Sequence, residues 1–342
     1  MSKKNDEEIR KVQLTGGSTY TLSLPKWWVE EMEVGAGDGM LVREKGSTLM
    51  VSPAKLQEGP ADLETEVRVR KGNSVEVINR KVLSLYLSGY NSINIVSEKD
   101  RLRSAKRNAV KNFVRRKLIG TEIISESIES ISLQTLLSYS ELSARGALKR
   151  MYNVVSSMQD NSLKALGNFD KELAHEVIQI DDEVDRFQMY LIREINAAVR
   201  KPSLLEKIGL ETLNDCLDYR LVSKNIERVG DHSGKVAEYI VDMDEPLSKE
   251  TVEKILDFSK KAISLFDGSV DSFFERDYES AEENIQKLNS IYKKEDEMNR
   301  YFAQTETAET LKGRLIMESI RRMAEYGCDI AEMVLNITVD LK

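Results

Sequence analysis

From Ser143 to its C-terminus the sequence is almost entirely compatible with helix, in stretches separated by short turn-like segments. Asn168 and Asp170 suit a helix start, as does Ser248 followed by Glu250, because short polar side chains there accept hydrogen bonds from free backbone N–H groups. We expect six helices, over residues 143–166, 170–200, 211–243, 249–276, 279–303 and 309–341. The C-terminal half is therefore expected to be all-α.

The second three helices read as a diverged copy of the first three. Residues 320–332 align without gaps with residues 226–238, and residues 295–299 align with residues 181–185. Because a repeated segment indicates a repeated structural unit, we expect two three-helix bundles. We assign residues 143–245 to the first repeat and residues 248–342 to the second.

Two pairs of carboxylates stand four residues apart in the first repeat, Asp181 with Asp185 and Glu227 with Asp231. A spacing of four puts both members of a pair on one helical face, one turn apart. The spacing fits convergence on a cation and fits two solvated helix faces equally, so it does not decide between them.

The turn between these two helices brings the pairs level. Pro202 and Gly209 favour a connection over residues 201–210 rather than a continuous helix. Asp185 and Glu227 each lie sixteen residues from their end of this turn. At about 1.5 Å per residue, both are roughly 24 Å from it in an antiparallel hairpin. Four level carboxylates resemble the metal sites of helical bundles, whose oxygen ligands suit hard or borderline cations.

Residues 226–238 read Ile-Glu-Arg-Val-Gly-Asp-His-Ser-Gly-Lys-Val-Ala-Glu. This segment resembles the signature Leu-Glu-Arg-Ile-Gly-Asp-His-Ala of PhoU, the family of phosphate-uptake regulators. The identities are Glu227, Arg228, Gly230, Asp231 and His232, and Ala237 and Glu238 match the trailing Ile-Ala-Glu. The resemblance implies two three-helix repeats whose E/D-x-x-x-D motifs bind metal clusters. It also implies regulation of phosphate uptake through a transporter or a sensor kinase, without catalysis.

The ligands implied in the first repeat are Asp181, Asp185, Glu227 and Asp231, for a divalent or trivalent metal ion such as Fe, Zn, Mg or Mn. The second repeat departs from the pattern, because Arg321 stands at the position of Glu227. A guanidinium repels a cation and does not ligate one. We therefore expect a degenerate second site of Glu295, Asn299 and Glu325, with Arg321 paired to Glu325 or Glu295 in place of a metal.

Residues 9–53 read as strand, strand, short helix, strand, strand. This order, with turns at residues 16–18 and 45–47 and with Gly37-Asp38, resembles the AbrB/SpoVT swapped-hairpin family, whose intertwined dimers in many cases bind DNA. About forty-five residues with few large side chains make a poor core alone, which independently favours a homodimer. Nucleic-acid candidates within residues 1–53 are Arg10, Lys11 and Lys26. Acidic residues offset them, so a pure dimerisation module is the alternative.

Residues 65–136 alternate strands and helices, as in a small α+β domain. From Arg68 to Lys117 there are fourteen Lys or Arg residues and three acids. The expected helix over residues 101–117 has one apolar face and one basic face. It either covers a sheet with a solvated basic face or meets an anionic partner, which is DNA or the protein's own acidic bundle. The nucleic-acid candidates on this helix are Arg103, Arg107, Lys111 and Arg115.

Other classes fit the sequence less well. It has no apolar run of eighteen residues and no apolar N-terminal core, so we expect a cytoplasmic protein without a membrane span. Cys216 and Cys328 fall in helical patterns and are expected to be buried reduced thiols. With two histidines and no set of nucleophile, base and orienter, a hydrolase is not expected.

The residues and the resemblances together predict a multidomain regulator: a small swapped-hairpin β domain, a small α+β domain and an all-α pair of bundles. The first rival is a direct DNA-binding repressor in which the bundle senses and the N-terminal dimer binds an operator. The second is a metal-dependent phosphoesterase or metal-storage bundle. Salt-dependent duplex binding distinguishes the first rival, and metal-dependent turnover of a phosphate ester the second.

Overall fold

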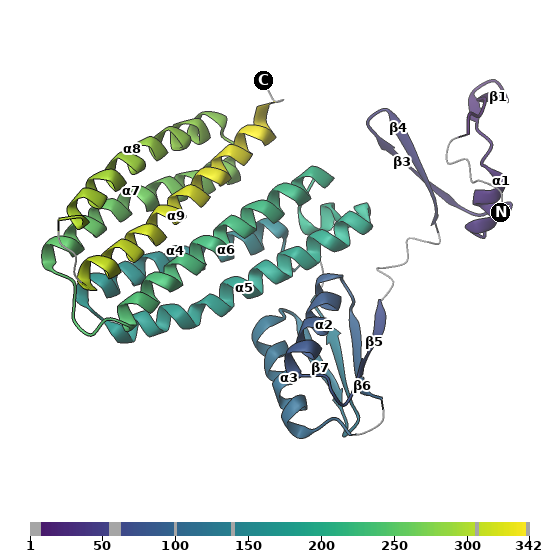
Figure 1. Cartoon of the computed structure of the whole chain (residues 1–342). Helices are drawn as coiled ribbons and strands as arrows, with labels where there is room; N and C mark the ends of the chain where they lie inside the picture. Colours follow the sequence, from purple (N-terminus) through teal and green to yellow (C-terminus); the bar gives the residue numbers. More distant parts are fainter. Residues whose placement is uncertain (1–7, 55–62, 99–100, 138–140, 305–307, 340–342) are drawn as a thin grey trace. The chain divides into compact units, whose positions relative to one another are not determined.

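Helices make up most of the chain, and the strands all precede the long helices (Figure 1). The computed structural model describes residues 8–54, 63–98, 101–137, 141–304 and 308–339. The chain forms two units, Met1–Asp62 and Leu63–Lys342. Within the described residues, no helix is long and apolar enough to cross a membrane.

The first unit contains two antiparallel hairpins with a short helix between them, in the order expected from the sequence. Gly16 and Gly46 lie in the hairpin turns with φ of 63° and 59°, a region that glycine adopts at little cost. The strands of the first hairpin have three residues each, and those of the second have six. The elements are β1 (Gln13–Thr15), β2 (Thr19–Thr21), α1 (Lys26–Glu31), β3 (Met40–Lys45) and β4 (Thr48–Pro53).

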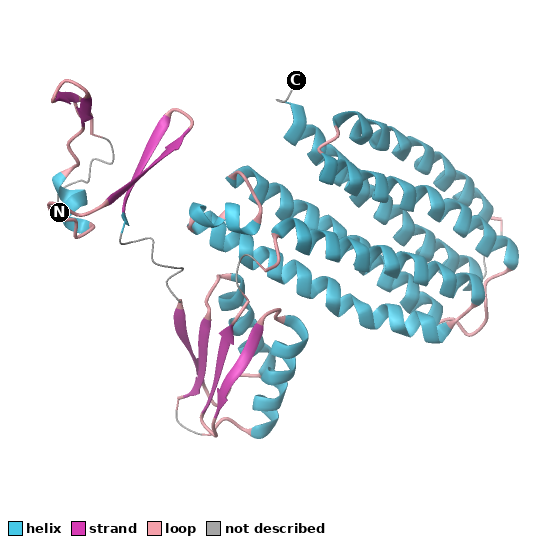
Figure 2. Cartoon of the chain, turned by 180° about the vertical axis from the view of Figure 1, so that it is seen from behind, coloured by secondary structure: helices cyan, strands magenta, loops and turns pink. Residues whose placement is uncertain are grey.

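The second unit begins with the expected small α+β domain. Its sheet has the order β5-β6-β8-β7, with β5 parallel to β6 and the other pairs antiparallel. Val67, Ile95 and Leu133 are buried on one face of this sheet, and the two helices cover that face (Figure 2). The elements are β5 (Glu64–Val69), α2 (Val75–Leu87), β6 (Ser92–Ser97), α3 (Ser104–Lys117), β7 (Thr121–Glu126) and β8 (Ser130–Thr135).

The remaining described residues form the six predicted helices. The side chains of Ser143, Asp170 and Ser248 accept hydrogen bonds from backbone N–H groups at helix starts. Two short 3-10 turns occupy the connection predicted over residues 201–210. The helices are α4 (Ala144–Asn168), α5 (Lys171–Arg200), α6 (Leu213–Val241), α7 (Lys249–Glu275), α8 (Tyr278–Phe302) and α9 (Ala308–Thr338).

Helices α4 to α6 pack together as one bundle and α7 to α9 as another, and the two bundles meet through α6 with α9 and α4 with α7. At the α6–α9 contact the rings of His232 and Tyr326 lie 5.8 Å apart, centroid to centroid. These two residues occupy equivalent positions in the aligned segments. The internal repeat in the sequence is therefore also a repeat in the packing. Cys216 and Cys328 are buried and free, as predicted.

Candidate metal centre

Helices α5 and α6 run antiparallel, and one hydrogen bond fixes their register. The Gln188 Nε2 donates to the carbonyl oxygen of Ser223 at 3.4 Å. With this register, Asp185 on α5 lies at the level of Glu227 on α6, to within one residue. One turn further from the connection, Asp181 lies at the level of Asp231. Helix α6 approaches α4 and α5 closely at Gly230, where an added Cβ would lie 3.2 Å from Val155.

The four predicted ligands lie close enough to influence one another's ionisation. Burial, then the charges of Glu227 and Asp181, raise the pKa of Asp231 to about 6. Burial, then the charge of Asp185, raise the pKa of Asp181. Carboxylates that disfavour one another's charged forms are stabilised by a cation between them. We call Asp181, Asp185, Glu227 and Asp231 the carboxylate cluster.

Two lysines already neutralise part of this cluster. The Nζ of Lys117, at the end of α3, lies 2.6 Å from a carboxylate oxygen of Asp185 and 2.6 Å from one of Asp182. The Nζ of Lys224 lies 2.5 Å from Glu227. The sequence pattern did not indicate the partner of Asp185, because Lys117 comes from a different domain, whereas Lys224 stands three residues before Glu227 on the same helix. In the structure, Asp185 and Glu227 are therefore each paired with a lysine, while the cluster's other two members are not part of these pairs.

The donor types of the cluster fit a hard or borderline cation, since all four are carboxylates. In the structure, two of the four, Asp185 and Glu227, are paired with lysines. Within the described ranges, no three His, Cys, Asp or Glu side chains converge closely enough to hold a metal ion as they stand. A bound ion in the cluster would therefore require Asp185 and Glu227 to exchange their lysine partners for the ion.

In the second repeat, an arginine occupies the equivalent place. The guanidinium of Arg321 lies 3.0 Å from Glu295 and 2.6 Å from Glu318, and it also pairs with Glu325. The predicted pairing of Arg321 is confirmed with both expected partners. Asn299 is exposed on α8. In the second repeat the positive charge comes from α9 of the same bundle, whereas in the first repeat it comes both from Lys224 of the same bundle and from Lys117 of the α+β domain.

The sequence patterns missed a second contact between α5 and the α+β domain. Arg193 is only 2% exposed, and its guanidinium donates to the carbonyl oxygens of Tyr86 at 2.7 Å and Tyr90 at 2.8 Å. It also donates to Asn91 Oδ1 at 2.5 Å and lies 4.9 Å from the Tyr86 ring centroid. Arg193, flanked by the apolar residues Leu191, Ile192 and Ile195 of α5, was the available signal.

The nucleic-acid candidates do not form one uncompensated basic surface. Arg107 and Lys111 both pair with Glu126 of β7, at 3.0 Å and 2.9 Å. In the first unit, Arg10 pairs with Glu8 and Lys26 with Glu30. Of the four candidates on the helix expected over residues 101–117, Arg107 and Lys111 are therefore compensated by an acid of the same domain. Four candidates, Lys11, Lys26, Arg103 and Arg115, are exposed, although Lys26 lies 3.6 Å from Glu30.

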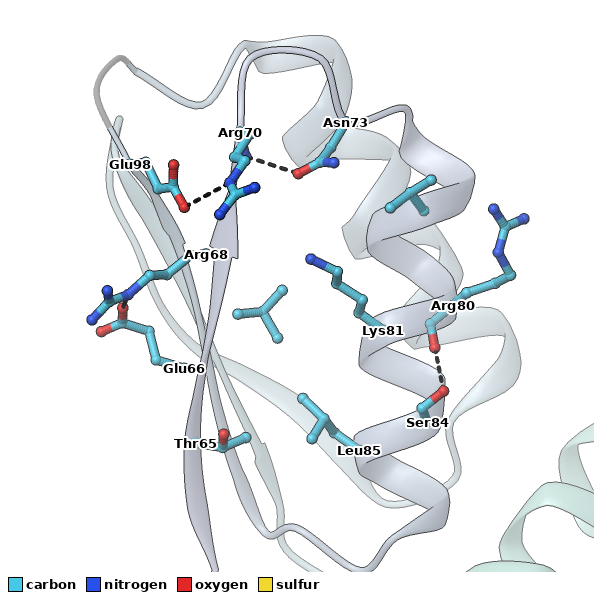
Figure 3. Close-up of a pocket in the computed structure, with 12 residues that line it drawn as sticks. Thr65, Glu66, Arg68, Arg70, Asn73, Arg80, Lys81, Ser84, Leu85 and Glu98 are labelled. Atoms are coloured by element: carbon cyan, nitrogen blue, oxygen red, sulfur yellow. Dashed lines mark hydrogen bonds and ion pairs between the residues drawn. The ribbon is translucent and has the colours of Figure 1, made fainter.

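A cleft of about 800 Å³ lies elsewhere, between β5 and α2 (Figure 3). Arg70, which directly follows β5, and Lys81 and Leu85, from α2, line it. Two of its arginines are already paired, Arg68 with Glu66 at 2.8 Å and Arg70 with Glu98 at 3.1 Å. No residue of the carboxylate cluster lines this cleft.

Comparison with known proteins gives matches to the helical part of the chain. The family model of the PhoU domain matches residues 148–240 and 255–334, which fall on α4 to α6 and on α7 to α9. A protein of Clostridium acetobutylicum, described as a phosphate-specific transport system accessory protein PhoU homolog, is 26% identical over 151 residues. The match covers 43% of this chain and 67% of that protein.

Two solved structures are also similar. The structure of PhoU from Pseudomonas aeruginosa has a TM-score of 0.48 at 20% identity, covering 58% of this chain and 96% of that chain. The phosphate transport system regulatory protein PhoU from Streptococcus pneumoniae has a TM-score of 0.48 at 19% identity, covering 58% of this chain and 94% of that chain.

Proposed function

The chain belongs to the PhoU family, and on that basis we propose that it regulates phosphate uptake as a non-catalytic accessory of a phosphate transporter or a sensor kinase. The observation that carries this proposal is the match of both three-helix repeats to the PhoU domain. The relative from Clostridium acetobutylicum, named as an accessory of a phosphate-specific transport system, supports the same role.

We further propose that the first repeat holds the regulatory metal ion. The ligands would be Asp181, Asp185, Glu227 and Asp231, and the ion divalent or trivalent, drawn from Fe, Zn, Mg and Mn. The supporting observation is the raised pKa of Asp231, to about 6, which reflects burial beside like charges that a cation would relieve. The second repeat would hold no ion, because Arg321 already neutralises Glu295 and Glu325.

The N-terminal unit is proposed to hold a homodimer by exchange of hairpins. This unit exposes large apolar side chains that a single copy leaves in water: Ile9 is 98% exposed, Tyr20 on β2 75% and Leu49 on β4 68%. Burying such side chains against a second copy is favourable by about 25 cal/mol per Å² of apolar surface. Direct operator binding, the rival role, needs a basic surface, and Arg10 and Lys26 are each paired with an acid.

The proposed role is tested by phosphate uptake in host cells that lack the gene. We expect uptake to continue in phosphate-rich medium without the protein and to be repressed again when the wild type is restored. The variant Glu227→Gln with Asp231→Asn should fail to restore repression, whereas Glu295→Gln, at the equivalent second-repeat position of Asp181, should restore it. Equal uptake with and without the gene would exclude the role in phosphate regulation.

A further inference from the structure

The α+β domain reaches the carboxylate cluster through the last turn of α3. Lys117 bridges Asp182 and Asp185, at 2.6 Å to each, and Arg116 pairs with Asp182. The side chains of Lys117 and Asp185 are 21% and 25% exposed, so this ion pair is largely shielded from water. The ammonium group of Lys117, from the α+β domain, is therefore paired with Asp185, which is one of the proposed metal ligands.

The contact between α5 and the α+β domain has two ends of different character. At one end, Arg193 is buried and hydrogen-bonded to backbone carbonyls, and Asn196 donates to the carbonyl of Leu87 at 2.9 Å. These bonds are specific and inaccessible to ions in solution. At the other end, Arg116 and Lys117 form ion pairs with aspartates. A cation from solution competes directly for these carboxylates. Between them, Met189 packs against the core of the α+β domain.

We propose that Lys117 and a metal ion compete for the carboxylate cluster, so that metal binding releases the end of α3 from α5 while the Arg193 end stays attached. This inference rests on the proposed metal site of the first repeat. Coupling of this kind is reciprocal: if the metal weakens docking of α3, docking of α3 weakens metal binding by the same factor. The docking of the α+β domain would then depend on whether the first repeat holds a metal ion, and a partner that binds this domain would respond to the difference.

The second repeat explains why only the first would act as a switch. Its cation, Arg321, is part of α9 itself, so replacing it would move no other domain. In the first repeat Lys224 of α6 pairs with Glu227, but the partner of Asp185 is Lys117, from a different domain and sixty-eight residues earlier in the chain. An ammonium ion and a metal ion repel each other at such distances, so the carboxylates accept one of them and not both.

Calorimetric titration of the full, metal-stripped chain with Mn²⁺ tests the competition. The variant Lys117→Met keeps the stem of the side chain and removes its charge. We expect it to bind Mn²⁺ at least about fivefold more tightly than the wild type, the lower end of typical coupling between linked sites. The matched control is Lys111→Met on the same helix. Lys111 is similarly exposed, at 20%, but its partner Glu126 lies within the α+β domain, so Mn²⁺ affinity should not change.

Hydrogen exchange provides the second readout. In the wild type, Mn²⁺ should speed amide exchange over residues 111–118 and leave residues 86–91, beside Arg193, unchanged. The double variant Glu227→Gln with Asp231→Asn should show no response to Mn²⁺. Equal Mn²⁺ affinity in the wild type and Lys117→Met, or Mn²⁺ binding without faster exchange at residues 111–118, would overturn the proposal.

The outcomes separate this inference from the proposed function. If neither the wild type nor Lys117→Met binds Mn²⁺, the competition is refuted, while regulation of phosphate uptake is still judged by the uptake of cells lacking the gene. If that uptake is regulated normally but Mn²⁺ affinity rises in Lys117→Met, the competition stands and the assigned pathway is wrong.

Discussion

The guanidinium of Arg321 lies 3.0 Å from Glu295, across the contact between α9 and α8. Arg321 stands at the position that Glu227 has in the first repeat, so a positive charge replaces a predicted ligand. Arg321 also pairs with Glu318 and Glu325, and it is shielded to 13% exposure. The second repeat thus satisfies its carboxylates within its own helices.

This pairing makes it possible to build a second metal site by substitution. Replacing Arg321→Glu together with Asn299→Asp restores the pattern of carboxylates found in the first repeat. We expect the double variant to bind additional Mn²⁺ and, without metal, to be less stable because like charges face one another. The measurement is Mn²⁺ stoichiometry by calorimetry. The control Arg322→Glu changes the neighbouring charge, and stoichiometry equal to the wild type in a folded double variant would contradict the prediction.

Arg193 is expected to hold the α+β domain on α5. The variant Arg193→Met leaves the carbonyls of Tyr86 and Tyr90 without their buried donor, at a cost of about 1.5–3 kcal/mol per charged hydrogen bond. We expect a lower melting temperature and faster amide exchange over residues 86–91. The variant Arg115→Met, at an exposed position of α3, should behave as the wild type. Unchanged exchange in Arg193→Met would show that other contacts hold the domain.

Glu194 should make stability depend on pH. It is 3% exposed, its Oε2 has no hydrogen-bond partner among the described residues, and burial raises its pKa to about 7 against the opposing charge of Arg193. A raised pKa means that the folded state holds the proton more tightly than the unfolded state. The associated stability is complete below the unfolded pKa of about 4.3 and is lost as pH rises through about 7.

The variant Glu194→Gln mimics the protonated side chain at every pH. Its stability relative to the wild type should therefore rise between pH 5 and pH 8, by at most roughly 3 kcal/mol. Denaturant unfolding at both pH values measures this difference, and other titrating groups cancel in it. The exposed neighbour Glu183→Gln is the control, and a pH-independent difference for Glu194→Gln would refute the assignment.

The N-terminal unit is expected to hold the dimer. Deleting residues 1–53 removes the hairpins whose apolar side chains are exposed, including Tyr20 and Leu49. Light scattering on a sizing column should then give the mass of one chain, with the helical circular dichroism of the remainder retained. A truncated protein that stays dimeric would place the dimer contact in the second unit instead.

The helical part of the fold could be predicted closely because its signals are local. Side chains such as Asp170 and Ser248 mark helix starts wherever they stand next to an apolar pattern, and the six helices begin and end within three residues of the expected limits. That Asp185 and Glu227 lie at the same height in the hairpin could be predicted by counting the residues between each of them and the turn that joins the two helices. The pairing of Arg321 followed from aligning the repeats.

The contact of Lys117 with Asp185 could not be predicted in this way, because it joins segments sixty-eight residues apart and depends on how two domains pack. The basic charge of α3 was visible, and the helical bundle was one of its two candidate partners, but no local pattern selected Lys117. Along α5, the spacing of Asp182, Met189, Arg193 and Asn196 marks one helical face. That face mixes charged, apolar and polar side chains, so it matches neither an apolar packing pattern nor a charged solvent-facing one.

Metal content of the purified chain tests the central claim, that the first repeat and not the second holds the ion. Elemental analysis should find metal in the wild type and in Glu295→Ala. It should find the metal lost in the double variant Glu227→Ala with Asp231→Ala, with the helical circular dichroism preserved. Equal metal content in the wild type and the double variant, or metal lost through Glu295→Ala, would contradict the account.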